Sequence, residues 1–229
     1  AAPVVPGLDG SHPLDERQAG EVLLGELRCA ACHADELAHV WARKTAPDLS
    51  EIGNRVSSEF LRRFLAEPAK VHSGVKMPDV LAGLPSAKRN EVAEALAHFL
   101  TERASKPFAR GKAGEGDSAR GRSLFHEIGC VACHFSRAEQ GKELDGVGLL
   151  SLAHVPEKYE SDSLAEFLFQ PHRARPSGRM PDLHLSQEET RDLAMYLMGE
   201  EPEQVEPLRV RPELVESGKK HFRDFNCVA

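Results

Sequence analysis

The sequence predicts an all-α protein in which two helical domains follow one another. Its apolar residues recur three or four positions apart, and no stretch shows the strict alternation of a half-buried strand. Aromatic residues make up 6% of the chain, fewer than all-β sandwiches and barrels usually contain. An internal duplication divides the 229 residues, and each half falls within the usual range of domain sizes.

Two copies of one pattern carry that duplication. A Cys-x-x-Cys-His segment occupies residues 29–33 and returns 101 residues later at 130–134, and a glycine stands nine residues before the first cysteine of each segment. A Met-Pro-Asp segment follows at 77–79 and again at 180–182, with two extra residues in the second copy. The shared order and spacing indicate a tandem repeat.

Three helices are expected in each copy. The first leads into the cysteine pair, the second is ended by a proline (Pro68 or Pro171), and the third follows the Met-Pro segment. Ser186, with Glu189 three residues later, forms a capping box that opens the third helix of the second copy. The apolar stripes of these helices cover residues 22–27 and 124–128, 60–65 and 164–168, and 92–100 and 193–197.

Composition shifts give the expected domain boundaries. Charged and glycine-rich residues separate the two copies, and a segment rich in proline and glutamate follows the second copy. The predicted organisation is an extended lead-in at 1–13, a first domain at 14–104, a linker at 105–117, a second domain at 118–200, a second linker at 201–217 and the start of a third module at 218–229.

Net charge and hydropathy exclude several functions. A formal charge of −7 argues against nucleic acid as the main partner. No run approaches the 18 or so consecutive apolar residues of a membrane-spanning helix. The chain opens with Ala1, Ala2 and Pro3, small residues that fit a secretory leader already removed, so we expect an exported protein.

Three chemistries compete for each Cys-x-x-Cys-His segment. A zinc site needs four ligands, and the two pairs are too far apart in sequence for the usual spacing. A thioredoxin-like redox pair needs a βαβ context, which the sequence lacks. Covalent attachment of haem c uses both thiols and then the adjacent histidine as an iron ligand. The third chemistry is favoured, with Cys29, Cys32 and His33 for one haem and Cys130, Cys133 and His134 for a second.

The methionines supply an independent argument. Of the four in the chain, only Met77 and Met180 occupy equivalent positions in the repeat, each after a cation and before a proline. A thioether is a soft, neutral ligand that stabilises Fe(II), so we predict both as axial ligands. The alternative is that they fill gaps in the core.

Each copy resembles a class I cytochrome c domain, over nearly all of residues 14–104 and 118–199. The resemblance implies two helical domains, each wrapped around a covalently bound haem, with a backbone carbonyl that accepts a hydrogen bond from the haem-ligating histidine. Pro47 lies in the segment that supplies it in the first copy, and Leu150 is opposite Pro47 in the second. Arg55 and Lys158 align with each other and are candidates to neutralise haem propionates, or are simply solvated.

Electron transfer between redox partner proteins is the function that follows from two His/Met-ligated haems, and export follows from haem c maturation with free thiols. A dihaem peroxidase is the alternative, but it needs one haem with a labile distal ligand, which the matched Met-Pro segments argue against. A further alternative is that the chain is the redox or docking part of a larger enzyme.

The end of the chain repeats the pattern a third time. Gly218 precedes Cys227 by nine residues, and residues 227–229 are identical to 130–132. The next two residues of the pattern are Cys and His, so we expect a longer protein with at least one more haem module. The alternative is a natural tail with one spare thiol. In a shortened module the helix after Gly218 is expected to be frayed or docked on the second copy.

Overall fold

A computed structural model describes residues 13–27, 29, 46–72, 75, 77–105, 116–137, 143–144, 149–199 and 207–227. These residues form helices joined by irregular segments, and their only β-type pairings are two isolated bridges, between His134 and Leu150 and between Arg137 and Glu143. The helical fold class predicted from the sequence is confirmed to this extent. None of the helices in the described part is long and apolar enough to cross a membrane.

The helices follow one another in this order. They are α1 (Glu16–Glu26), α2 (Ile52–Arg55), α3 (Ser58–Ala66), α4 (Pro68–Val71), α5 (Ser86–Glu102), α6 (Ser118–Glu127), the 3-10 helix η3 (Cys130–Ala132), α7 (Val155–Lys158), α8 (Ser161–Phe169), α9 (Pro171–Ala174), α10 (Gln187–Met198) and α11 (Pro212–Asp224).

The repeat in the sequence is also a repeat in the structure. Helices α2 to α5 recur in the same order as α7 to α10. In both copies proline is the first residue of the short helix, and the residue before it has the same non-helical backbone: φ −147°, ψ 70° at Glu67 and φ −140°, ψ 70° at Gln170. A residue before proline is pushed out of the helical region, so the chain turns at the same point in each copy.

Helix α6 packs against α10 and completes the second copy. The two helices cross where Gly121 lies, since a Cβ there would be only 2.0 Å from the carbonyl oxygen of Asp192. The ring of Phe125, 1% exposed, meets the ring of Tyr196 with centroids 5.5 Å apart. The predicted capping box is confirmed, since Ser186 accepts from the Glu189 amide and Glu189 accepts from the Ser186 amide.

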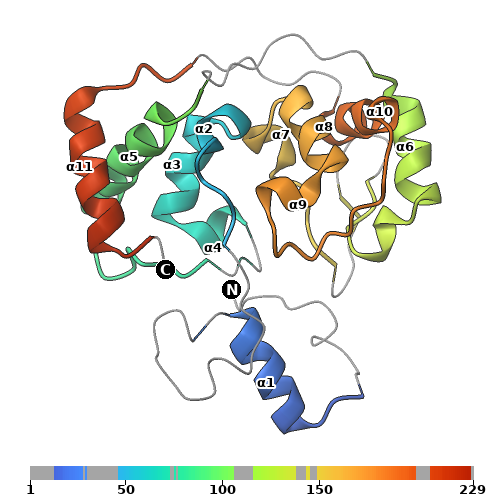
Figure 1. Cartoon of the computed structure of the whole chain (residues 1–229), viewed down its shortest axis with the longest axis horizontal. Helices are drawn as coiled ribbons and strands as arrows, with labels where there is room; N and C mark the ends of the chain where they lie inside the picture. The colour runs from blue at the N-terminus through green and yellow to red at the C-terminus, as the bar shows by residue number, and fades with distance from the viewer. Residues whose placement is uncertain are drawn as a thin grey trace.

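The two copies meet through α2 and α3 on one side and α7 and α8 on the other (Figure 1). The amide of Ser57 donates to the carbonyl of Lys158 at 2.9 Å, and its hydroxyl donates to the carbonyl of Glu157 at 2.8 Å. In the opposite direction, the hydroxyl of Ser163 donates to the carbonyl of Arg55 at 3.1 Å. The accepting residues Arg55 and Lys158 are equivalent in the repeat, whereas the donors Ser57 and Ser163 are not.

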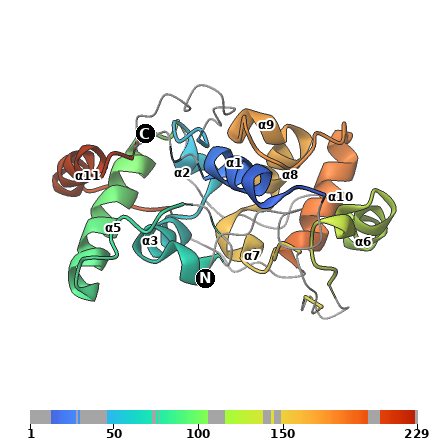
Figure 2. The same cartoon turned by 90° about the horizontal axis from the view of Figure 1, so that it is seen from below.

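The last helix lies on the first copy. Figures 1 and 2 show α11 alongside α5 at one edge of the molecule, just as α6 lies alongside α10 at the other. Helix α11 begins at Pro212 rather than at residue 218, and it docks on the first copy rather than on the second.

Helix α1 is placed differently. It lies away from α5, below the other helices in Figure 1, and buries none of its residues. At its end, Glu26 forms an ion pair with Arg179 of the second copy, with Oε2 and Nε 3.1 Å apart.

Candidate functional site

The cysteine pair of the second copy stands directly after α6. The helix ends at Glu127 with Ile128 as its C-cap, and Gly129 then adopts φ +92°, a left-handed conformation that glycine allows without steric cost. This turn leads the chain into η3, which begins at Cys130. Cys130 is half-buried and its thiol pKa is raised by burial, whereas Cys133 is exposed. Neither forms a disulfide, so both thiols are free to react.

His134 is held by the backbone of the loop that follows. Its Nδ1 lies 3.3 Å from the carbonyl oxygen of Leu150, and the amide of Leu150 donates to the carbonyl of Cys133 at 2.8 Å. A carbonyl can only accept, so Nδ1 carries the proton and Nε2 keeps its lone pair. Burial lowers the pKa of His134, which also favours the neutral ring. A neutral imidazole oriented in this way is the form that ligates a metal.

Arg137 ties this loop to the rest of the second copy. Its guanidinium is 5% exposed and donates to the carbonyls of Leu197 on α10 and Leu152 after the loop, both at 2.7 Å. Glu143 accepts from the hydroxyl of Ser151 at 2.6 Å and from the amide of Leu152. Arg137 is not recognisable from the sequence, because an arginine is normally exposed and nothing in the spacing marks this one as buried.

Met180 lies between α9 and α10 of the second copy. It is half-buried and packs against the main hydrophobic cluster. Its carbonyl accepts a hydrogen bond from Nε2 of His172 at 3.0 Å, and the amide of Gly178 donates to the carbonyl of Arg175 at 2.8 Å. These two contacts shape the loop that presents the methionine. His172 is a further residue that the sequence analysis did not single out.

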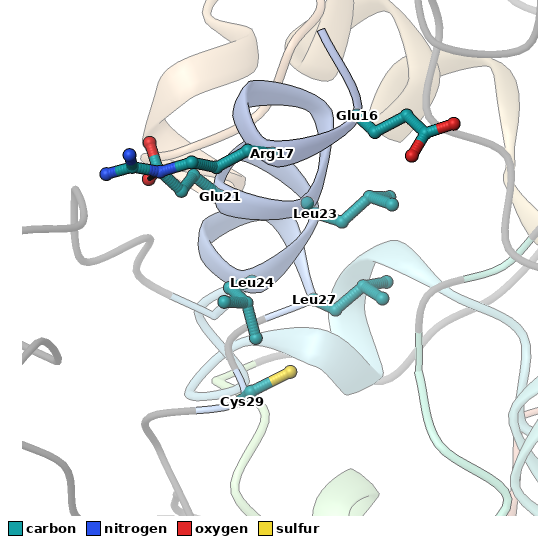
Figure 3. Close-up of a pocket in the computed structure, with 8 residues that line it drawn as sticks. Glu16, Arg17, Glu21, Leu23, Leu24, Leu27 and Cys29 are labelled. Carbon is teal, nitrogen blue, oxygen red and sulfur yellow. Dashed lines mark hydrogen bonds and ion pairs between the residues drawn. The ribbon is translucent and has the colours of Figure 1, made fainter.

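The first copy is described only in part. Cys32 and His33 lie outside the described residues, while Met77 is half-buried and Pro47 is exposed. Cys29 is half-buried at one end of a shallow pocket along α1 (Figure 3). The guanidinium of Arg55 donates to the carbonyl of Asp48, next to Pro47.

Lys158, the equivalent of Arg55, faces the contact between the copies. Its Nζ lies 4.7 Å from the ring centroid of Tyr159 and 5.5 Å from that of Phe60, and it is 9% exposed. Burial lowers its pKa.

Two histidines stack beside it. The ring centroids of His72 and His154 are 4.3 Å apart, and burial lowers the pKa of His72 to about 4 and that of His154 to about 2. Both rings are therefore neutral in the folded protein near pH 7.

The donor set of the second copy suits one class of cofactor. Two free thiols three positions apart, an oriented neutral imidazole directly after them and a half-buried thioether on a later loop of the same copy are the groups that hold a c-type haem. In the same part of the core, the hydroxyl of Tyr196 is buried with no hydrogen-bond partner among the described residues. An unpaired buried hydroxyl is costly unless a further group is present to receive it.

Comparison with known proteins agrees with this class. Residues 118–200 match the family model of cytochrome c. This match supports a c-type cytochrome domain at residues 118–200, which implies covalently bound haem c and supports haem-based electron transfer as a general function. Comparisons with curated proteins and with solved structures gave no significant match.

Proposed function

We propose that the chain transfers electrons between redox partner proteins through two covalently attached haems c, one in each copy, both with histidine and methionine as axial ligands. The observation that carries the proposal is the arrangement around His134. This residue follows a free cysteine pair, its Nδ1 is bonded to a backbone carbonyl, and it lies in the matched domain.

In the second copy each residue has a separate task. Cys130 and Cys133 would hold the haem through thioether bonds to its two vinyl groups. His134, fixed by the Leu150 carbonyl, would ligate iron from one side, and Met180 from the other. The iron of the bound haem supplies a reversible one-electron couple, and a thioether ligand raises its reduction potential.

The first copy is proposed to work in the same way. Cys29, Cys32, His33 and Met77 occupy the corresponding positions in the repeat. The structural equivalence of α2–α5 with α7–α10 supports this, since the same framework then carries Met77 and Met180. With His33 and Met77 on one iron and His134 and Met180 on the other, no position would be left open for a substrate, which favours electron transfer over a peroxidase.

Two wider proposals follow. Attachment of haem c with free thiols takes place outside the cytoplasm, so the protein is proposed to be periplasmic or otherwise exported. The pattern that begins at Gly218 and reaches Cys227 supports a third haem module in a longer protein.

Mass spectrometry and near-infrared spectroscopy of the holoprotein test the two haems and their ligands. We expect two covalent haems per chain and a methionine-to-iron(III) charge-transfer band that loses about half its intensity in Met77→Leu and again in Met180→Leu. Met198→Leu is the matched control, because Met198 is 4% exposed on α10 and only fills the core. One haem per chain, or an unchanged band in both ligand variants, would refute the proposal.

A further inference from the structure

Three helices of this chain carry one docking pattern. In each, a glycine stands nine residues before a cysteine. The residues six, five and two positions before that cysteine lie on the same side of the helix as the glycine. These positions are Gly20, Leu23, Leu24 and Leu27 in α1, Gly121, Leu124, Phe125 and Ile128 in α6, and Gly218, His221, Phe222 and Phe225 in α11.

Helix α6 shows what the pattern is for. Gly121 lets it approach α10 so closely that a Cβ would meet the carbonyl oxygen of Asp192 at 2.0 Å, and Phe125 then packs on Tyr196. The pattern therefore defines a helix that crosses the last helix of a copy at its glycine.

Helix α11 makes the same joint with α5. A Cβ at Gly218 would lie 2.1 Å from the carbonyl oxygen of Ala95, and the rings of Phe222 and Phe99 have centroids 5.3 Å apart. Ala95 and Phe99 are four residues apart on α5, just as Asp192 and Tyr196 are four residues apart on α10, and each pair receives the glycine and then the aromatic ring of the partner helix. Helix α11 thus occupies the surface of the first copy that corresponds to the α6 site of the second.

Helix α1 carries the same pattern, but its glycine and leucines are not packed against another described helix. Within the described part of the chain, no atom lies within 4 Å of a Cβ at Gly20, whereas its two counterparts are in close contact. Leu23, Leu24 and Leu27 are 37%, 36% and 38% exposed. Figure 3 shows the side chains of Leu23 and Leu27 on one side of the helix, with Leu24 and Cys29 near its end.

We propose that α1 and α11 are alternative occupants of one surface on α5, so that α1 docks there through Gly20 and its leucines when α11 leaves. The proposal rests on the proposed function in one respect. Docked α1 brings the haem-attachment segment 29–33 to the copy that carries Met77, whereas docked α11 brings Cys227 there.

Polar contacts at one end of α11 account for its place in this structure. The amide of Arg211 donates to Nδ1 of His98 at 3.2 Å, and its guanidinium pairs with Glu94, 3.0 Å from Oε1. The corresponding position before α1 is Pro13, which has neither an amide hydrogen nor a charge. These contacts stabilise docked α11 alone, so removing them shifts the exchange toward α1.

The test uses the full-length holoprotein and hydrogen exchange of the amides in α1, α5 and α11. Gly218→Leu prevents α11 from approaching α5 closely, and Gly20→Leu is the matched variant that prevents the same approach by α1. Arg211→Ala is a milder variant that weakens α11 without adding bulk. Cys227 gives a second readout, because it is the one thiol left when the other four cysteines hold haem, and it is half-buried next to docked α11.

Competition is reciprocal, so blocking one helix must favour the other. We expect Gly218→Leu and Arg211→Ala to speed alkylation of Cys227 and to slow exchange in α1 by about tenfold or more, with α5 still protected. Adding Gly20→Leu to Gly218→Leu should abolish the slowing in α1. If instead α1 is already docked in the holoprotein, Gly20→Leu alone should slow alkylation of Cys227.

Three results would overturn the proposal. One is that neither block changes the other helix. Another is that alkylation of Cys227 is unchanged in Gly218→Leu and in Gly20→Leu. The last is that α5 loses protection in both Gly218→Leu and Arg211→Ala, because α1 would then be unable to replace α11. Haem content, measured by mass on the same samples, tells failure of the proposed function apart from failure of this exchange.

Discussion

Replacing Gly121 with alanine is expected to open the joint between α6 and α10. The new Cβ would lie 2.0 Å from the Asp192 carbonyl oxygen, and ordinary contact begins at 3.4 Å, so the helices must separate by more than an ångström. A gap of that size forfeits up to about half of the contact energy. Burial of Phe125 is worth about 1.5–3 kcal/mol, and overpacking against rigid backbone typically costs about 1–3 kcal/mol. We therefore expect a loss of about 2–3 kcal/mol, after the small gain in helix propensity.

Hydrogen exchange in α10 measures this loss within the second copy. A cost of about 2–3 kcal/mol corresponds to amide exchange about 30- to 150-fold faster when opening is at equilibrium. Gly83→Ala is the control, because no described residue comes within 4 Å of a Cβ at that position. If Gly121→Ala exchanges no faster in α10 than the control does, the close crossing of the two helices is wrong.

Three other perturbations test separate parts of the structure. Arg137→Met leaves two buried carbonyls without their donor and should cost about 2–4 kcal/mol in urea unfolding, whereas Arg173→Met, whose side chain is 71% exposed, should cost under about 0.5 kcal/mol. Ser57→Ala removes both the helix cap of α3 and a bond across the two copies, so we expect a loss of about 1–2 kcal/mol in thermal unfolding. Burial lowers the pKa of His72 to about 4 and of His154 to about 2, from an ordinary 6.5. The unfolded chain therefore binds more protons below pH 6.5, and the free energy of unfolding should fall as the pH drops from 6.5 to 4. Urea unfolding of His154→Phe should show a smaller fall; an equal fall would contradict this assignment.

Helix ends and the repeat could be predicted because local chemistry determines them. Proline cannot continue the helix before it, so Pro68 and Pro171 mark the same turn in both copies. The capping box at Ser186 needs only two side chains three residues apart. Such features depend on neighbours in sequence and are visible without the fold.

The sequence does not reveal which helix packs on α5, because α1 and α11 carry the same pattern. Gly20 and Gly218 both stand nine residues before a cysteine, and both helices present apolar side chains. Contacts at Arg211, with residues more than 100 positions away in the sequence, are what distinguish α11. Burial of Arg137 is likewise a property of the folded loop and not of any pattern around it.

The contact between the copies has a consequence for assembly. Ser57 reaches across to the carbonyl of Lys158 and Ser163 reaches back to that of Arg55, so equivalent carbonyls accept on the two sides. One exposed ion pair, Arg63 with Glu157, and stacked rings add to the contact. Joining the copies in one polypeptide gives each an effective concentration for the other of the order of millimolar. The fused chain can thus keep the pair together at any dilution, whereas free subunits would separate below their dissociation constant.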